Sequence, residues 1–468
     1  MKTPRVHPAY SLEIVVSNDQ MKRTGKILEK AAGHVDVRVA GPPASGWTRL
    51  VLTTESEQHL LDLESRLRQG LDFHLVYCED RVLACSRGGK TQTRASVPLD
   101  TPEDLAIAYT PGVSRVSRLL AQSPDRVNEL TGKANRVAVV TDGSAVLGLG
   151  NLGPVAALPV MEGKAALFAR LAGIDAVPIC LDTQDVNGIV RAVTAIAPTF
   201  GGINLEDISA PRCFEVEKRL RDALDIPVIH DDQHGTAIVV LAAMLNALQT
   251  VAKQLETARI VIVGAGAAGT AVTRLLLVAG ARDVTVWAPV GVLHPHIERQ
   301  VPDHKRWLAR HTNPRGIQGG LAEALNKADA VVGVSAPGVL SRALIKRMAR
   351  SPIVFALANP HPEVDPDDIA DLGAIIATGS SEYPNQVNNA LAFPGLFQGL
   401  LGSSTARLDE QVFLAAAHTL ANLAKPASPT RLLPEVLDPS VAPAIATAVK
   451  DASNREPPTV PTEGSTYG

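Results

Sequence analysis

The chain has 468 residues, of which 46% are hydrophobic and 20% are charged, and its formal net charge is −3. This size and near-balanced charge predict a soluble chain of two or three domains and exclude the basic surface typical of nucleic-acid binding. The longest apolar run, in "TAIVVLAAMLNAL", is interrupted by Asn246, and the N-terminus lacks a signal-peptide core, so we expect a cytoplasmic protein with no membrane partner.

Residues 1–88 are predicted to form a separate module. Apolar strand-like segments and amphipathic helical segments follow one another here in the order βαββαβ, which is the split unit of small ferredoxin-like domains. The segments are "YSLEIVV", "QMKRTGKILEKAAG", "HVDVRVAG", "WTRLVLTT", "EQHLLDLESRLRQG" and "FHLVYCED". The polar, turn-rich stretch "RGGKTQTRASVPLDTPED" that follows is typical of a linker.

Beyond the linker, short apolar strands alternate with helical patterns, which predicts α/β architecture with parallel sheets covered on both faces. We divide this part into a substrate and metal domain at 89–236 and a Rossmann NAD(P)-binding domain at 237–450. Ligands of such sheets bind at the carboxyl ends of the strands. Residues 451–468 are polar and rich in proline, so we expect a disordered tail.

The stretch "RIVIVGAGAAGTAVTRLLLVAG" is the predicted dinucleotide-binding loop. Gly264, Gly266 and Gly269, with Ala267 between them, follow a strand and open a helix, where glycines permit a tight turn and close approach of a pyrophosphate. The next strand ends at Ala288 instead of the acidic residue that commonly binds the ribose of NAD. Since no Arg or Lys adjoins Ala288, we expect NAD, with NADP as the alternative.

Carboxylates follow two strands of the substrate and metal domain. Glu206 and Asp207 come after "GGIN", and Asp231 and Asp232 come after "IPVI", so both pairs are expected at one sheet edge. Like charges gathered there repel strongly unless a cation neutralises them. Oxygen ligands without a soft donor favour Mg²⁺ or Mn²⁺.

An alternative interpretation assigns these carboxylates no ligand. In that reading Asp232 caps the helix that begins at "GTAIVV", and "LEDI" is a solvated loop. The histidines that flank the pair, His230 and His234, are expected to pack or to support the carboxylates rather than to bind a metal.

Several ordered stretches between about residues 93 and 421 make the chain resemble the malic enzyme family. The stretches are "DLAIAYTPGV", "TDGSAVLGLGNLGP", "PVMEGKAALF", "GGINLEDI", "HDDQHGTA", the GAGAAG loop, "ALANPHPE" and "YPNQVNNALAFPGLF". The resemblance implies that Glu206, Asp207 and Asp232 are metal ligands and that Asp231 is the carboxylate beside the catalytic lysine.

The same resemblance implies the remaining site residues. Lys164 in "MEGKA" matches the family's general base, and Tyr109 in "AYTPG" matches its general acid. Asn359 in "ALANP" and Asn389 in "QVNNA" match amides that hold the malate carboxylate and the nicotinamide side of the site. On residue pattern alone, Lys164 would be taken for a helix-surface lysine and Tyr109 for a packed aromatic.

The implied reaction is metal-dependent oxidative decarboxylation of (S)-malate to pyruvate and CO₂ with reduction of NAD or NADP. One alternative is a malolactic enzyme, which shares these motifs, retains its NAD and releases lactate. The other is a catalytically weak, ACT-regulated sensor paralogue, which only the departures from the family pattern suggest and against which the intact Tyr109, Lys164 and carboxylates argue. Those departures are His361, Ser380 and Glu382, besides Ala288, and they leave substrate affinity and cofactor preference open.

The N-terminal module resembles an ACT domain. Such domains commonly bind a small effector at the turn after the first strand, which here reads "SNDQMKRTG" and carries Met21 where glycine is usual. The alternative is a purely structural or dimerising role. We expect a homodimer or a higher homo-oligomer.

Overall fold

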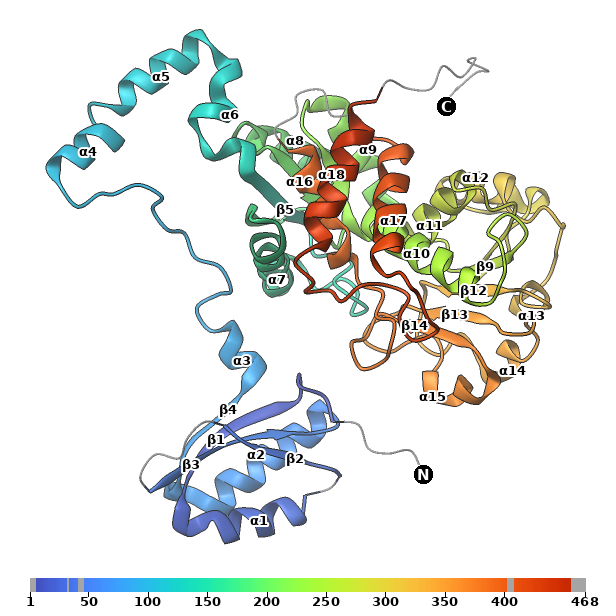
Figure 1. The fold of residues 1–468 in the computed structure, drawn as a ribbon, viewed down its shortest axis with the longest axis horizontal. Coiled ribbons are helices and arrows are strands. Elements are labelled where there is room, and N and C mark those ends of the chain that lie inside the picture. Colours follow the sequence, from blue (N-terminus) through green and yellow to red (C-terminus); the bar gives the residue numbers. More distant parts are fainter. Residues whose placement is uncertain (1–5, 32, 41–45, 402–407, 456–468) are drawn as a thin grey trace. The chain divides into compact units, whose positions relative to one another are not determined.

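A computed structural model describes residues 6–31, 33–40, 46–401 and 408–455. The chain forms two compact units, Met1–Thr93 and Arg94–Gly468, and many of their elements are labelled in Figure 1. Among the described residues, no helix combines the length and apolar character needed to cross a membrane.

The first unit is a four-stranded antiparallel sheet in the order β2-β3-β1-β4 with two main helices. Its elements are β1 (Ser11–Ser17), α1 (Met21–Glu29), β2 (Asp36–Val39), β3 (Trp47–Thr53), α2 (Glu57–Leu71), β4 (Leu75–Asp80) and the short α3 (Arg81–Ser86). Alternate residues of β1, Leu12, Ile14 and Val16, are fully buried together with α2 residues such as Leu63. The predicted βαββαβ order is therefore confirmed.

The second unit begins with three helices and a four-stranded parallel sheet in the order β6-β5-β7-β8. The helices are α4 (Pro102–Ala108), α5 (Val113–Gln122) and α6 (Val127–Leu130). The sheet and its helices are β5 (Arg136–Thr141), α7 (Pro154–Ala172), β6 (Asp175–Cys180), α8 (Val186–Ile196), β7 (Gly202–Leu205), α9 (Arg212–Ala223), β8 (Val228–His230) and α10 (Asp231–Thr250).

The Rossmann sheet has the order β11-β10-β9-β12-β13-β14, in which β11 alone runs antiparallel to its neighbour. Its elements are β9 (Arg259–Val263), α11 (Ala267–Val278), β10 (Asp283–Ala288), β11 (Gly291–Val292), α12 (Asp303–His311), α13 (Leu321–Ala324), β12 (Ala330–Gly333), α14 (Arg342–Ile345), β13 (Ile353–Ala356), α15 (Pro366–Ile369) and β14 (Ile375–Thr378). The helices α16 (Phe393–Leu400), α17 (Glu410–Leu423) and α18 (Val441–Ser453) follow. The predicted α/β class with a Rossmann domain is confirmed.

Helix α10 connects the two sheets of this unit. Fourteen of its twenty residues are buried, as expected for a helix that is apolar on all sides. One continuous core contains α10 together with Val139 of β5, Ile260 of β9 and Phe393 of α16. Separate clusters cover the outer face of each sheet. The helix that starts at the predicted site is thus the centre of the second unit.

Two of the boundaries predicted from the sequence fall within helices. The boundary placed between residues 236 and 237 lies inside α10, and α18 extends to Ser453, into the segment expected to be a tail. Residues 456–468 of that segment lie outside the described residues.

Candidate active site

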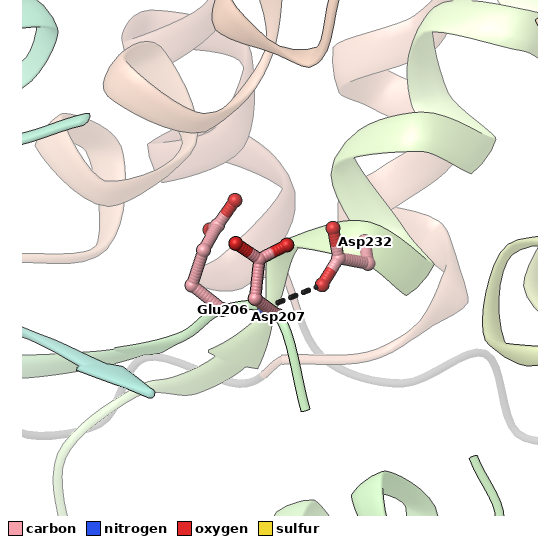
Figure 2. Close-up of side chains that lie close together, drawn as sticks. All are labelled: Glu206, Asp207 and Asp232. Carbon is pink, nitrogen blue, oxygen red and sulfur yellow. Dashed lines mark hydrogen bonds between the residues drawn. The ribbon is translucent and has the colours of Figure 1, made fainter. Parts of the chain in front are cut away.

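The two predicted carboxylate pairs lie together because their strands are neighbours. Strands β7 and β8 are parallel, with Leu205 opposite His230, so the residues that follow them emerge at one edge of the sheet. One carboxylate oxygen from each of Glu206, Asp207 and Asp232 lies within 4.8 Å of the others. Figure 2 shows the three side chains converging, with the Asp207 backbone N–H donating to Asp232 Oδ2 at 2.8 Å.

Asp207 is held in a strained conformation. Its φ of 54° lies in the left-handed region, which non-glycine residues adopt at a cost of about 1–3 kcal/mol and which is common at functional sites. The backbone N–H of Ala145 donates to its carbonyl oxygen at 2.9 Å. Its Oδ2 is buried and has no hydrogen-bond partner among the described residues. Burial, followed by repulsion from Asp232 and Glu206, raises the pKa of Asp207 to about 8.

The donor set fits a hard divalent cation. Burial, reinforced by the charge of Asp231, also raises the pKa of Asp232 to about 6. Carboxylates that resist ionisation by mutual repulsion are neutralised best by a cation that binds them jointly. All three side chains offer oxygen, the donor that Mg²⁺ and Mn²⁺ prefer.

Lys164 reaches this cluster from α7 and is buried. Its Nζ donates to Asp231 Oδ2 at 2.5 Å and lies 2.8 Å from Glu206 Oε1. Burial on its own would lower the pKa of Lys164, but the charges of Asp231 and Glu206 outweigh burial, so the pKa is raised. Phe393 places its ring 4.2 Å from the ammonium, and Asn389 Nδ2 donates to Asp231 Oδ2 at 2.6 Å.

Gly235 leaves the space that the Asp231 side chain occupies. A Cβ atom at Gly235 would lie 1.9 Å from Asp231 Oδ1, which is far inside van der Waals contact. Glycine in a helix interior costs about 1 kcal/mol relative to alanine. We infer that this glycine lets Asp231, one turn earlier in α10, fold back toward Lys164.

The substitution Gly235→Ala tests the role of this glycine, because alanine favours the helix but would displace the Asp231 side chain. We expect a loss of kcat of about a hundredfold, since displacement of a catalytic group by about 1 Å has that effect. Steady-state kinetics with malate, the substrate that the resemblance implies, and a thermal melt measure both quantities. The control is Gly25→Ala in α1, where a Cβ would meet nothing within 4 Å. Unchanged kcat in Gly235→Ala would show that the position of Asp231 is not critical.

The glycine loop has the geometry of a dinucleotide site. Gly264 has φ of 120°, and its Cβ would lie 2.5 Å from the carbonyl oxygen of Val334 after β12. A Cβ on Gly269 would lie 2.0 Å from Gly264 O, whereas at Gly266, which precedes Ala267 at the start of α11, it would face open space. The loop lies where the strand order reverses between β9 and β12, which is the switch point at which such sheets bind nucleotides.

Ala288 lies in a different environment from the one expected. It pairs with Gly291 across a two-residue turn and is fully buried in the core. Its side chain is therefore not accessible to the ribose of a bound cofactor. Both turn residues after this strand, Pro289 and Val290, are exposed, and Val290 is 55% exposed. A role for this strand end in cofactor choice stays a prediction.

Two substitutions test this strand end. Ala288→Asp should bury an unpaired carboxylate and destabilise the protein by roughly 3 kcal/mol or more, measured as a lowered melting temperature. Val290→Asp should be tolerated and should weaken NADP relative to NAD by charge repulsion with the 2′-phosphate. Tighter NAD binding by a fully stable Ala288→Asp variant would contradict the buried placement.

Asn359 lies where the two sheets of the second unit approach. A Cβ on Gly148, in the loop before α7, would lie 1.5 Å from Asn359 O, and one on Gly379 would lie 2.7 Å from Asn359 Nδ2. The glycines therefore let backbone pack directly against Asn359. The structure brings Asn389, but not Asn359, into hydrogen-bond contact with the carboxylate cluster.

Tyr109 is not brought to the cluster. It follows α4 directly and is 63% exposed. Within the described chain, the ion pairs of Lys164 go to Asp231 and Glu206, and α4 lies apart from α7 in Figure 1.

Gly235, Phe393 and Glu217 also contribute to the site, although their roles were not predicted from the sequence. Glu217 accepts a hydrogen bond from the ring of His234 at 3.1 Å, in line with the supporting role expected of that histidine. The sequence does indicate that Glu217 is unusual, because this charged residue lies on the apolar face of α9 with buried Val216 and Leu220. His230 is fully buried with its ring Nε2 3.8 Å from Asp232 Oδ2.

A Rossmann nucleotide site and a carboxylate cluster around a buried lysine define a dinucleotide-binding α/β protein, and comparison with known proteins narrows this class. The family models for the malic enzyme N-terminal domain and the malic enzyme NAD binding domain match residues 88–221 and 233–453. The chain belongs to the malic enzyme family. The matched region begins at residue 88, near the end of the first compact unit, Met1–Thr93.

Relatives in this family use either cofactor. The NAD-dependent malic enzyme of Geobacillus stearothermophilus is 49% identical over 383 residues, which cover 81% of this chain and 80% of the relative. The NADP-dependent malic enzyme of Halomonas elongata is 47% identical over 349 residues, which cover 74% of this chain and 82% of the relative. The crystal structure of an NAD-dependent malic enzyme from Thermotoga maritima has a TM-score of 0.77 and 44% identity, covering 80% of this chain and 99% of that one.

Proposed function

We propose that the chain is a malic enzyme, which oxidises and decarboxylates (S)-malate to pyruvate and CO₂ while it reduces NAD, with NADP as the alternative cofactor. The observation that carries the proposal is the contact of Lys164 with both Asp231 and Glu206 beside two further carboxylates. The residues that we propose as base and metal ligands lie together in this cluster. The hydrogen bond that Asn389 donates to Asp231 connects this cluster to the segment that follows the Rossmann sheet.

Lys164 is the proposed general base. In its neutral form, Lys164 Nζ would take the proton of the malate C2 hydroxyl, and the C3–C4 bond would then break to release CO₂. NAD, when bound at the glycine loop, would supply the acceptor for the C2 hydride. Asp231 holds the lysine in place, and Asn389 holds Asp231. Asn359 and Asn389 are also proposed to orient the substrate carboxylate and the nicotinamide. Tyr109 returns a proton to C3, which gives pyruvate.

A divalent cation held by Glu206, Asp207 and Asp232 would supply Lewis-acid stabilisation of the negative charge that develops on the substrate when CO₂ leaves. The unpartnered Oδ2 of Asp207 supports this assignment. Glu206 would then be shared between cation and lysine, which weakens its hold on the Lys164 proton.

Removal of one ligand charge tests the cation site. Asp232→Asn keeps an oxygen that can accept from the Asp207 N–H, yet it should reduce kcat on the order of a thousandfold through lost charge stabilisation. Chelation should abolish activity, with recovery on addition of Mn²⁺. Asp222→Asn, on the exposed surface of α9, is the control and should behave as wild type. Full activity in excess chelator would refute the assignment.

We further propose that a second copy of the chain supplies Tyr109. Within the described chain, no residue of α4 or α5 is buried, and Leu105 and Ile107 of α4 are 51% and 69% exposed. At the start of α7 and in the loop before it, Val155 and Leu149 are also exposed, at 85% and 59%. Exposed apolar surface of this kind is commonly covered by a partner, and a homodimer would cover both sets.

Mixed dimers test this arrangement. Co-expression of Tyr109→Phe and Lys164→Ala chains should restore pyruvate formation to about a quarter of wild type, because about half of the dimers are mixed and each has one intact site. Each variant alone should form little pyruvate. The matched control pairs Lys164→Ala with Asp232→Asn, which lie in one cluster and should not complement. No recovery in the first mixture would place Tyr109 in its own subunit's site.

For the N-terminal module we propose an ACT-like regulatory role, with a small-molecule effector at the turn after β1. The ferredoxin-like order of its strands supports this role. In that turn Asn18 is fixed by a hydrogen bond from Thr48 Oγ1 to its Oδ1 at 2.6 Å.

A further inference from the structure

Glu217 is a buried carboxylate that contacts the first turn of α10, which carries the proposed cation ligand Asp232. It lies on α9, and its side chain is 8% exposed. Its Oε1 accepts from Arg221 Nη2 at 2.8 Å and from the His230 backbone N–H at 2.9 Å. Its Oε2 accepts from Gln233 Nε2 at 3.2 Å and from His234 Nε2 at 3.1 Å.

Three of these donors flank the pair Asp231 and Asp232 in the sequence, namely His230, Gln233 and His234. His230 is the N-cap of α10 and makes no side-chain capping bond, although the first turn of a helix has backbone N–H groups that need acceptors. Glu217 supplies one acceptor from a neighbouring helix and also holds the side chains of Gln233 and His234. Arg221 Nε donates to the carbonyl oxygen of Val228 at 2.9 Å, so the end of β8 is held by the same group.

The charge of Glu217 makes this contact hard to break. Burial on its own would raise the pKa of Glu217, but the charges of His234 and Arg221 outweigh it and lower the pKa to about 2. A buried carboxylate that loses its partners is strongly destabilising. The first turn of α10 therefore cannot move away from α9 without a large free-energy cost.

We propose that Glu217 is a positioning residue that fixes the first turn of α10, so that Asp232 presents its carboxylate to the divalent cation shared with Glu206 and Asp207. The inference rests on the proposed function, since it requires that this cluster binds a cation. The competing explanation is an ion pair that only stabilises α9. That helix carries a second pair of the same i,i+4 spacing, Glu215 with Arg219 at 3.3 Å, in which Glu215 is 60% exposed.

The test is the affinity of the full chain for Mn²⁺, measured by the electron paramagnetic resonance signal of the free ion. Glu217→Gln keeps the side-chain volume and removes the charge. We expect its Kd for Mn²⁺ to rise about 10–100-fold, the usual effect of removing a group that orients metal ligands, and excess Mn²⁺ to recover most of kcat. Glu215→Gln is the matched control and should bind Mn²⁺ as wild type does.

The outcomes are separable. A lower melting temperature of Glu217→Gln with unchanged Kd would overturn the proposal and leave a structural ion pair. If Glu217→Gln does not fold, Gln233→Met decides, because it removes one bond and retains the ion pairs; a Kd raised at least threefold supports the proposal and an unchanged Kd overturns it. Binding of Mn²⁺ by Asp232→Asn as tightly as by wild type would overturn the metal site itself, and the role of Glu217 with it.

Discussion

Repulsion among carboxylates at one sheet edge is the constraint on which the site depends. Glu206, Asp207, Asp231 and Asp232 follow two neighbouring parallel strands, and one lysine lies among them. Lys164 compensates two of the four charges directly. The pKa of Asp207 is raised to about 8 by burial and by its neighbours, so the protein alone leaves that side of the cluster without compensation. A site of this kind is arranged to receive positive charge from outside.

The groups around the cluster hold it against that repulsion. Asp207 is fixed through its backbone by Ala145 and by the bond of its N–H to Asp232. Asp231 is fixed by Lys164 on one side and Asn389 on the other. The charged cluster is thus attached to the loop after β5, to α7 and to the segment after β14, and no single element carries it. Because the partners come from several elements, local flexibility in one of them is resisted by the others.

The sequence predicted the elements of this site better than their contacts. Strand ends, the glycine loop and the carboxylate pairs are local patterns, and each lies where it was expected. The contacts of Asp231 with Lys164 and Asn389 span 67 and 158 residues, and no local period encodes them. Ala288 shows a second limit, because the two-residue turn that buries it is set by pairing with Gly291. Tyr109 shows a third, because its local motif does not reveal that it lies exposed after α4 and away from the cluster.

Helix α10 has a consequence for how this fold can be rearranged in evolution. Its first turn carries Asp231 and Asp232, and the rest of it lies in the core shared by both sheets. The same helix therefore contributes buried residues to the core of both sheets. A recombination event that exchanged the Rossmann part for one from another lineage would have to cut this helix or bring a foreign one into a fitted core. The cofactor half and the acidic half of such a protein are therefore expected to be inherited together and not to behave as exchangeable modules.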